Sequence, residues 1–270
     1  MRWTKLNFLI SARKIMPAVA LIVVGFCLSL RAAEPPVLWP RQVDVPPNKN
    51  ALKACLDFLD SAAGTQPQEL KPAVQFQKLF LQIVSGVPRA DWSGEVEKLA
   101  NSSGQSPVEA GVREISRVWL SRLEMADIDT ALRNYYRRNV SFPATFAEVE
   151  ADLPEKLRKD PWGEPWVYQP HAPKGFERLS TQRYQLGPSQ FPKLGTLSDA
   201  VGHRDPPGQS WQIALHDVGG NKALEFRSAE AGASVAIIQP GGKVGDCTLL
   251  FIGEHWALMA GVDQIFAVVF

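Results

Sequence analysis

The residues best suited to acid–base or metal chemistry in this 270-residue chain are its histidines and cysteines. The histidines, whose spacing matches no metal-binding pattern, are His171, His203, His216 and His255. The three cysteines form no CxxC pair. His216 and Asp217 are adjacent, and they form either an acid–base couple or simply the end of a strand before the turn at Gly219. We therefore expect no catalytic residue, no metal and no cofactor.

Two short motifs imitate known catalytic loops. Gly241-Gly-Lys243 lacks the preceding glycine and the following Ser or Thr of a phosphate-binding loop, so a hairpin turn is the simpler interpretation. His203-Arg-Asp205 imitates a kinase catalytic loop but lacks its downstream asparagine and the upstream glycine-rich loop. Neither motif supports an enzyme.

Aromatic side chains offer a different chemistry, the stacking of sugars or peptides. A groove of tryptophans would make the chain an exported hydrolase or a carbohydrate- or peptide-binding module. Packing in the core and covering of a sheet is the alternative. The tryptophans concerned are Trp162, Trp166, Trp211 and Trp256.

The first 33 residues are typical of an export signal. Basic residues up to Lys14 precede an apolar run over residues 15–30, and Ala32 and Ala33 offer small residues at a cleavage site. The run is slightly short for a spanning helix of about 20 residues. Two outcomes stay open, cleavage as a signal peptide and retention as an inner-membrane anchor. Both predict a protein of the periplasm or cell envelope.

Charge and cysteine content fit such a location. Residues 1–33 carry five basic residues and no acidic one, which leaves 24 basic and 28 acidic residues in the rest of the chain. A weakly acidic protein has no electrostatic reason to bind nucleic acid, so we expect none as a partner. Cys55 and Cys247 remain beyond the signal. An oxidising compartment would permit a disulfide between them, but no spacing pattern links the two, and unpaired buried thiols are the alternative.

The chain beyond the signal divides into four parts, and the predicted fold class is α+β. Residues 34–50 contain five prolines and predict an extended tether. Residues 51–106 have helical apolar spacing and predict a helical layer. Residues 107–208 begin with a long helix and continue in short, proline-punctuated segments. Residues 209–270 hold short apolar segments between glycine turns, the pattern of a compact antiparallel sheet or small barrel.

A turn in the third part has a clear physical logic. Asp160 precedes Pro161, so its backbone is biased to extended geometry and its carboxylate is placed to accept N–H groups across the turn. Gly163 supplies a backbone conformation that other residues resist, and Trp162 offers an apolar cover. These four residues predict a structural turn that opens a sheet.

This turn and the helix end before it resemble the soluble head of the major pseudopilin of bacterial type II secretion systems. That family has an "ALxxYxxxNxxFPxT" run, matched here by Leu132, Tyr135, Asn139, Phe142 and Pro143. A later "DPWGxPYxY" turn is matched by Asp160, Pro161, Trp162, Gly163, Pro165 and Tyr168. The resemblance covers roughly residues 120–200. It implies a pseudopilin-head-like α/β centre and partners among secretion-system proteins.

The departures from that family matter as well. The processed Gly-Phe-Thr-Leu-Ile-Glu type N-terminus of pilins is missing, so the resemblance does not imply polymerisation. The family's late loop binds calcium through several carboxylates, whereas the corresponding residues 195–199 hold only Asp199, with Asp205 six residues further on. We expect no calcium site.

The C-terminal part resembles, more faintly, the periplasmic "homology region" β-domain of secretion and pilus-assembly proteins. Val244, Gly245, Asp246, Leu250 and Ile252 fit that pattern loosely. The apolar segment over residues 265–270 predicts a strand that is either buried against the core of this part or leaves an adhesive edge or face for a partner. The candidate interaction residues of this part are Trp256, Ile265, Phe266 and Phe270.

Together these features predict a non-enzymatic, exported scaffold or interaction component related to type II secretion or pilus-like machinery. Its expected partners are other envelope or secretion-system proteins, with inner-membrane anchoring through residues 15–30 if the signal is retained. The alternative is the exported hydrolase or carbohydrate- or peptide-binding module with a tryptophan-lined surface.

Overall fold

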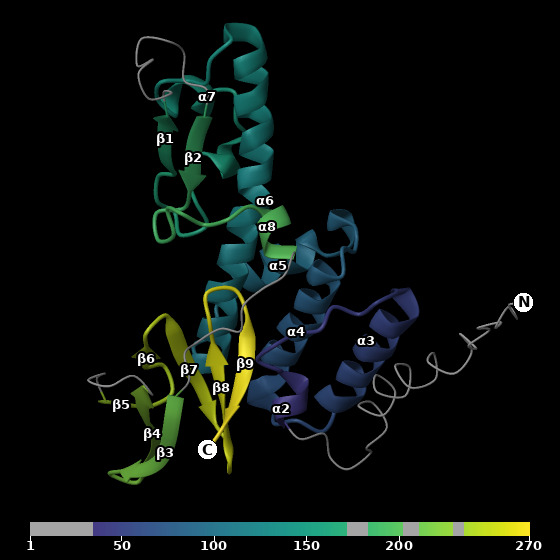
Figure 1. Ribbon diagram of the computed structural model, residues 1–270, viewed down its shortest axis with the longest axis vertical. Helices are drawn as coiled ribbons and strands as arrows, with labels where there is room; N and C mark the ends of the chain where they lie inside the picture. The colour runs from purple at the N-terminus through teal and green to yellow at the C-terminus, as the bar shows by residue number, and fades with distance from the viewer. Residues whose placement is uncertain (1–34, 172–182, 202–210, 229–234) are drawn as a thin grey trace, which may run out of the picture.

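The fold is α+β, as expected, with helices first and antiparallel strands after them (Figure 1). The computed structural model describes residues 35–171, 183–201, 211–228 and 235–270. The expected export signal and the His203–Asp205 motif lie outside these ranges. Within them, no helix is both long enough and apolar enough to span a bilayer.

In the described ranges, the structure has the expected helical region and the expected long helix, together with three short helices that the sequence did not predict. The bounds of the helices are α2 Pro35–Leu38, α3 Lys49–Ala63, α4 Lys71–Val84, α5 Ser93–Ala100, α6 Pro107–Asn139, α7 Ala147–Glu150 and α8 Leu197–Val201. Short 3-10 turns are η1 Gln68–Leu70, η2 Arg89–Asp91 and η3 Glu155–Leu157. The longest helix, α6, starts at a capping box in which Ser106 and Glu109 each bond to the other's backbone N–H, with Pro107 at its first position.

The strands form three antiparallel sheets. Their bounds are β1 Val167–His171, β2 Arg183–Gly187, β3 Trp211–Val218, β4 Asn221–Ser228, β5 Val235–Ile238, β6 Lys243–Val244, β7 Cys247–Ile252, β8 Trp256–Ala260 and β9 Ile265–Val269. The first sheet pairs β1 with β2, the second has the order β3-β4-β5, and the third has the order β6-β7-β8-β9. The C-terminal part is thus two packed sheets in place of one compact sheet or barrel.

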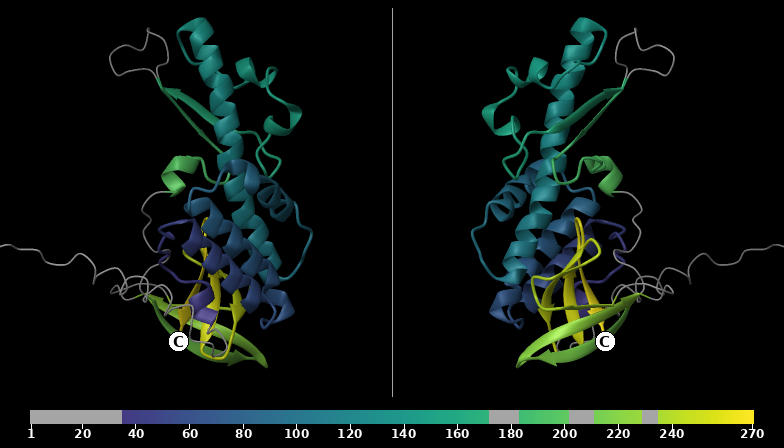
Figure 2. Two further views of the ribbon diagram at one scale, coloured as in Figure 1. Left: turned by 90° about the vertical axis from the view of Figure 1, so that its right-hand side faces the viewer. Right: turned by 90° about the vertical axis from the view of Figure 1, so that its left-hand side faces the viewer.

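Helices and sheets build two bodies along α6, which we call the base and the head. In the base, the first half of α6 packs on one face of sheet β6–β9, α4 and α5 pack against α6, and α3 packs against α4 (Figure 1). The other face of this sheet packs on sheet β3–β5. Gly111 lets α6 approach this sheet, because a Cβ there would meet Leu250 Cδ2 at 2.3 Å. The head consists of the second half of α6, helix α7 and the β1–β2 hairpin around a separate core (Figure 2).

The expected tether over residues 34–50 is wrong for its first part. Residues 35–38 form α2, and Leu38 and Trp39 are completely buried in the base. The Trp39 ring stacks on that of Trp256, with centroids 6.1 Å apart, and its Nε1 donates to the carbonyl of Ala73 at 3.3 Å. Prolines suggested an extended linker, but burial of an indole removes about 200 Å² of largely apolar surface from water and favours docking.

The expected helical region and the expected β-domain share one hydrophobic core. Leu250, Leu258 and Ile265 from sheet β6–β9 belong to the same core as Phe76, Phe80 and Trp119 from the helices. The first and last parts of the chain therefore fold around each other. The sequence pattern missed this because periodicity identifies an element's apolar face but not the element that covers it.

Candidate functional site

The turn at Asp160 is a hydrogen-bonded joint inside the head. The Asp160 carboxylate is buried, and Oδ1 accepts from the backbone N–H groups of Trp162 and Glu164 at 2.9 Å each. Its Oδ2 accepts from Ser189 N at 2.8 Å and Ser189 Oγ at 2.6 Å, across 29 residues of sequence. Gly163 has φ +86°, a left-handed conformation that glycine tolerates. The carboxylate therefore ties the turn to the segment that follows β2.

Trp162 connects this turn to the long helix. Its Nε1 donates to Glu114 Oε2 at 2.7 Å, and its ring lies 5.9 Å from that of Phe191. The side chain is half-buried and covers the turn from outside. The four turn residues thus act through structure, and none of them offers a reactive group to a ligand.

An aromatic cluster fills the core of the head. Phe142 packs against Tyr184 with ring centroids 4.7 Å apart, and Tyr168 donates its hydroxyl to the carbonyl of Pro143 at 2.9 Å. Burial raises the pKa of Tyr168 to about 12, and burial together with the hydrogen bond to Asp129 raises the pKa of Tyr184. Both hydroxyls stay protonated at neutral pH. They serve as hydrogen-bond donors and not as bases.

A buried ion pair lies in the base, close to the point where α6 enters the head. Arg122 on α6 lies 2.6 Å from Asp263 in the β8–β9 turn, and the two side chains are 6% and 14% exposed. The guanidinium also donates to the carbonyl of Gly195 at 3.3 Å and lies 4.5 Å above the ring of Trp119. Trp119 Nε1 in turn donates to the Asp263 carbonyl at 2.8 Å. No sequence motif predicts this ion pair, because Arg122 and Asp263 are 141 residues apart in the chain.

Glu124 lies on α6 where the two bodies meet. Its Oε2 is buried without a hydrogen-bond partner in the described part of the chain. Burial raises the pKa of Glu124 to about 8, and the nearby Lys156 only partly opposes this. The protonated carboxyl is therefore the favoured form in the folded protein near neutral pH.

The candidate interaction residues at the end of the chain are largely buried. Ile265 and Phe266 are completely buried, and Trp256 and Phe270 are partly buried. The edge of β9 that faces away from β8 is partly covered, because Ala267 N donates to the carbonyl of Trp39 at 2.7 Å. An apolar terminal strand needs a partner, and the chain supplies one from its own N-terminal segment.

The four tryptophans that suggested a groove lie in different places. Trp166 is buried in the head core, Trp211 packs edge-on to Phe226 in the core between the two C-terminal sheets, and Trp256 packs in the base. Trp162 covers the turn. They share no surface, so the tryptophan-lined groove is wrong.

The adjacent His216 and Asp217 serve different partners. His216 Nε2 lies 2.6 Å from Glu225 Oε2, whereas Asp217 Oδ1 accepts from Gly220 N at 2.7 Å in the β3–β4 turn. Arg227 also contacts Glu225, and this contact lowers the pKa of that carboxyl. The acid–base couple is therefore not formed by these two residues.

The loop expected to lack calcium uses its carboxylate for a helix cap. Asp199 Oδ2 accepts from Thr196 N and Thr196 Oγ1, both at 2.8 Å, at the start of α8. Among the described residues, no three His, Cys, Asp or Glu side chains are grouped to hold a metal. Cys55 on α3 and Cys247 on β7 are not joined to each other.

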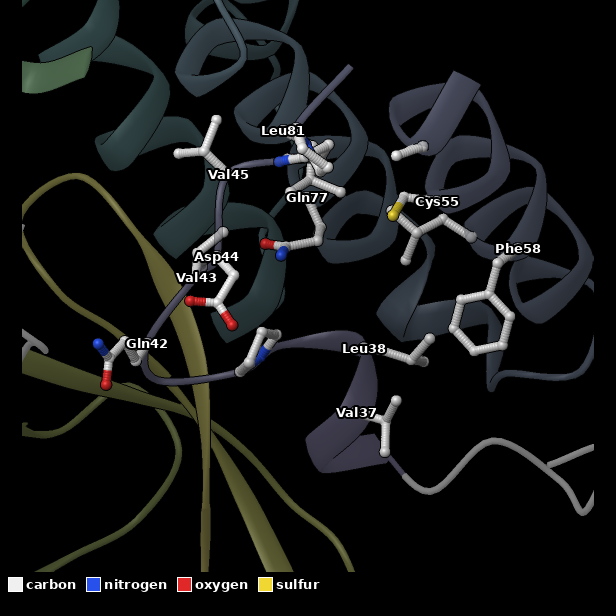
Figure 3. Close-up of a pocket in the computed structure, with 15 residues that line it drawn as sticks. Val37, Leu38, Gln42, Val43, Asp44, Val45, Cys55, Phe58, Gln77 and Leu81 are labelled. Carbon is white, nitrogen blue, oxygen red and sulfur yellow. The ribbon is translucent and has the colours of Figure 1, made fainter. Parts of the chain in front are cut away.

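A cavity of about 330 Å³ lies between residues 37–47, α3 and α4 (Figure 3). Its wall is largely apolar and includes Val43, Phe58 and Leu81. Gln77 projects its amide from α4 toward residues 42–44 (Figure 3). This side chain is 1% exposed, and its Oε1 has no hydrogen-bond partner among the residues described. Sequence analysis missed the cavity, although a glutamine within the apolar face of α4 was a visible signal.

Comparisons with protein-family models, curated proteins and solved structures found no match for this chain.

Proposed function

We propose that the chain is a non-enzymatic scaffold of the cell envelope, which holds two different surfaces apart within a secretion- or pilus-like assembly. The observation that carries this proposal is helix α6. At 33 residues it is about 50 Å long, and it runs through the cores of both the base and the head. A continuous helix fixed at both ends is a spacer of defined length.

The head supports a pseudopilin-like role in particular. The residues of the two matched motifs meet in one small core, where Leu132, Phe142 and Tyr168 pack around the hairpin. The Asp160 turn then fixes the hairpin's exit to that core. This arrangement is what a head domain requires in order to present its hairpin and helix tip to a neighbouring subunit.

The described residues favour no second function. The candidate catalytic pair serves two separate partners, and the tryptophans of the expected groove lie in three separate cores and on one turn. An exported scaffold whose partners are other envelope proteins is therefore the better-supported function.

Site-specific photocrosslinking in the native host tests the proposal. A photoreactive residue at Arg137 on the head, and another at Gln68 on the base, each sit at exposed positions. We expect both to give adducts in the membrane-periplasm fraction, with different envelope proteins at the two ends. Adducts confined to cytoplasmic proteins, or the same single partner at both ends, would contradict a two-ended envelope scaffold.

A further inference from the structure

In the part of the chain that the structure describes, Gln77 is the one strongly polar side chain buried in the wall of the cavity beneath residues 37–47. Its neighbours on the same face of α4, three and four positions away, are apolar and buried: Ala73, Val74, Phe80 and Leu81. Buried polar atoms in folded proteins nearly always have a hydrogen-bond partner, because leaving an acceptor unpaired costs free energy. Oε1 is such an unpaired acceptor within the described residues. A donor that entered the cavity would satisfy it.

The other residues that line the cavity indicate which kind of molecule would carry a hydrogen-bond donor to Gln77. Val37, Val43 and Phe58 present carbon, which favours an apolar body. Among the described residues that line the cavity, the one charged side chain is that of Asp44, which is exposed at its edge. An anionic head group would meet this carboxylate and no lining cation. The cavity therefore selects against a carboxylate or phosphate.

Size sets a further limit. A volume of about 330 Å³ is at the small end of ligand pockets and is far too small for a helix. We infer that this cavity binds a small, uncharged, apolar molecule whose O–H or N–H group donates a hydrogen bond to Gln77 Oε1. This inference stands apart from the scaffold function, since it concerns a small molecule and rests on different residues.

Three probes of equal chain length test it on the full chain by titration calorimetry. 1-Octanol supplies a donor, octyl methyl ether has an acceptor but no donor, and octanoate is anionic at neutral pH. We expect octanol to bind about tenfold more tightly than the ether, the effect of one hydrogen bond. Octanoate should bind more weakly than both. Affinity should also fall roughly fourfold per methylene on going from octanol to hexanol.

Two variants test whether the preference for octanol over the ether depends on Gln77. Gln77→Leu keeps the volume but removes the acceptor, so octanol should bind no better than the ether while the ether is unaffected. Gln68→Leu makes the same change at an exposed position and should leave the tenfold preference intact. If Gln77→Leu fails to fold, the probe series on the unmodified chain decides the matter by itself. Equal binding of octanol and the ether, preference for octanoate, or no binding of any probe would overturn the inference.

Discussion

The base and the head share helix α6 but are stabilised in different ways. The base is held by a large apolar core that includes four fully buried aromatic side chains, Trp39, Phe76, Phe80 and Trp119. The head has a small core and depends on polar contacts, such as the four hydrogen bonds of the Asp160 carboxylate. Helix α6 thus belongs both to a base that is stabilised mainly by apolar packing and to a head that depends on specific hydrogen bonds.

This difference follows from size. A small body exposes much of its surface, so burial of apolar groups contributes less and each fixed turn or buried hydrogen bond matters more. The motif residues lie in the head, where each specific side chain has a defined partner. In the base, a core position mainly requires an apolar side chain of suitable volume, and several residue types meet that requirement. The sequence of the base therefore contains less specific motifs.

The largest expected effect is that of Trp39→Ala in the base. The variant removes a fully buried indole that stacks on Trp256, and we expect a loss of about 3–5 kcal/mol in the free energy of unfolding. Val45→Ala is the control from the same segment, because that side chain is 47% exposed and should change stability by less than about 0.5 kcal/mol. Denaturant unfolding gives both values. If both variants lowered the free energy of unfolding by the same small amount, residues 34–50 would be a tether, as the sequence predicted.

The next effect tests whether an ion pair of the base also couples base and head, because Arg122 donates to Gly195, which follows the head residue Leu194. Arg122→Met leaves Asp263 buried without this partner, and we expect a loss of about 3–5 kcal/mol. The exposed pair Arg89–Asp127, at 2.7 Å with both side chains 41% exposed, is the control. Arg89→Met should cost less than about 1 kcal/mol. Two separate transitions in the Arg122→Met variant, read by tryptophan fluorescence and far-UV circular dichroism, would show that this ion pair couples the bodies. A similar small effect of both variants would contradict a structural role for the buried pair.

A smaller loss is expected in the head. Asp160→Ala removes four accepted hydrogen bonds, and Gly163→Val places a β-branched residue at φ +86°, so each should destabilise the protein by about 1–3 kcal/mol. Asp152→Ala removes only an exposed ion pair with Arg138 and serves as the control. Melting temperatures that are unchanged in both turn variants would show that the turn does not brace the head.

A pH-dependent effect is expected where the bodies meet. Burial raises the pKa of Glu124 to about 8, well above the 4.5 of an exposed glutamate. Between these values the native state keeps a proton that the unfolded state has released, so this group's contribution to stability falls as pH rises, by up to about 1.4 kcal/mol per unit. In Glu124→Gln that decline between pH 5 and 8 should become shallower. Glu148 provides the contrast, since hydrogen bonds from Tyr135 and the Thr145 backbone lower its pKa and its contribution is lost on acidification. Parallel pH profiles for the parent and Glu124→Gln would contradict the assignment.

How far sequence predicted the structure also differs between the two bodies. In the head, the positions of α6, the Asp160 turn and both strands follow from local patterns, since proline, glycine and helical periodicity act over a few residues. In the base, helices and strands were found, but the docking of Trp39 and the Arg122–Asp263 pair were not. These contacts join residues far apart in the chain, and no local propensity encodes them. The Gln77 cavity was missed for the same reason.

The smallest effect concerns a second left-handed position, at the tip of the head. Val140 follows the end of α6 with φ 58°, a conformation that places its Cβ too close to the next carbonyl, and its side chain is 68% exposed. Glycine would remove this strain, although its greater freedom in the unfolded chain offsets part of the gain. We expect Val140→Gly to stabilise the protein by about 0.5–1 kcal/mol in denaturant unfolding. Val140→Ala, which keeps most of the strain and removes the apolar surface, is the control and should change stability by less than about 0.5 kcal/mol. Strained, exposed apolar residues persist where binding needs them, so both variants should weaken crosslinking from Arg137 if the tip contacts a partner. A stabilised Val140→Gly with undiminished crosslinking from Arg137 would show that the strain at Val140 serves no partner contact.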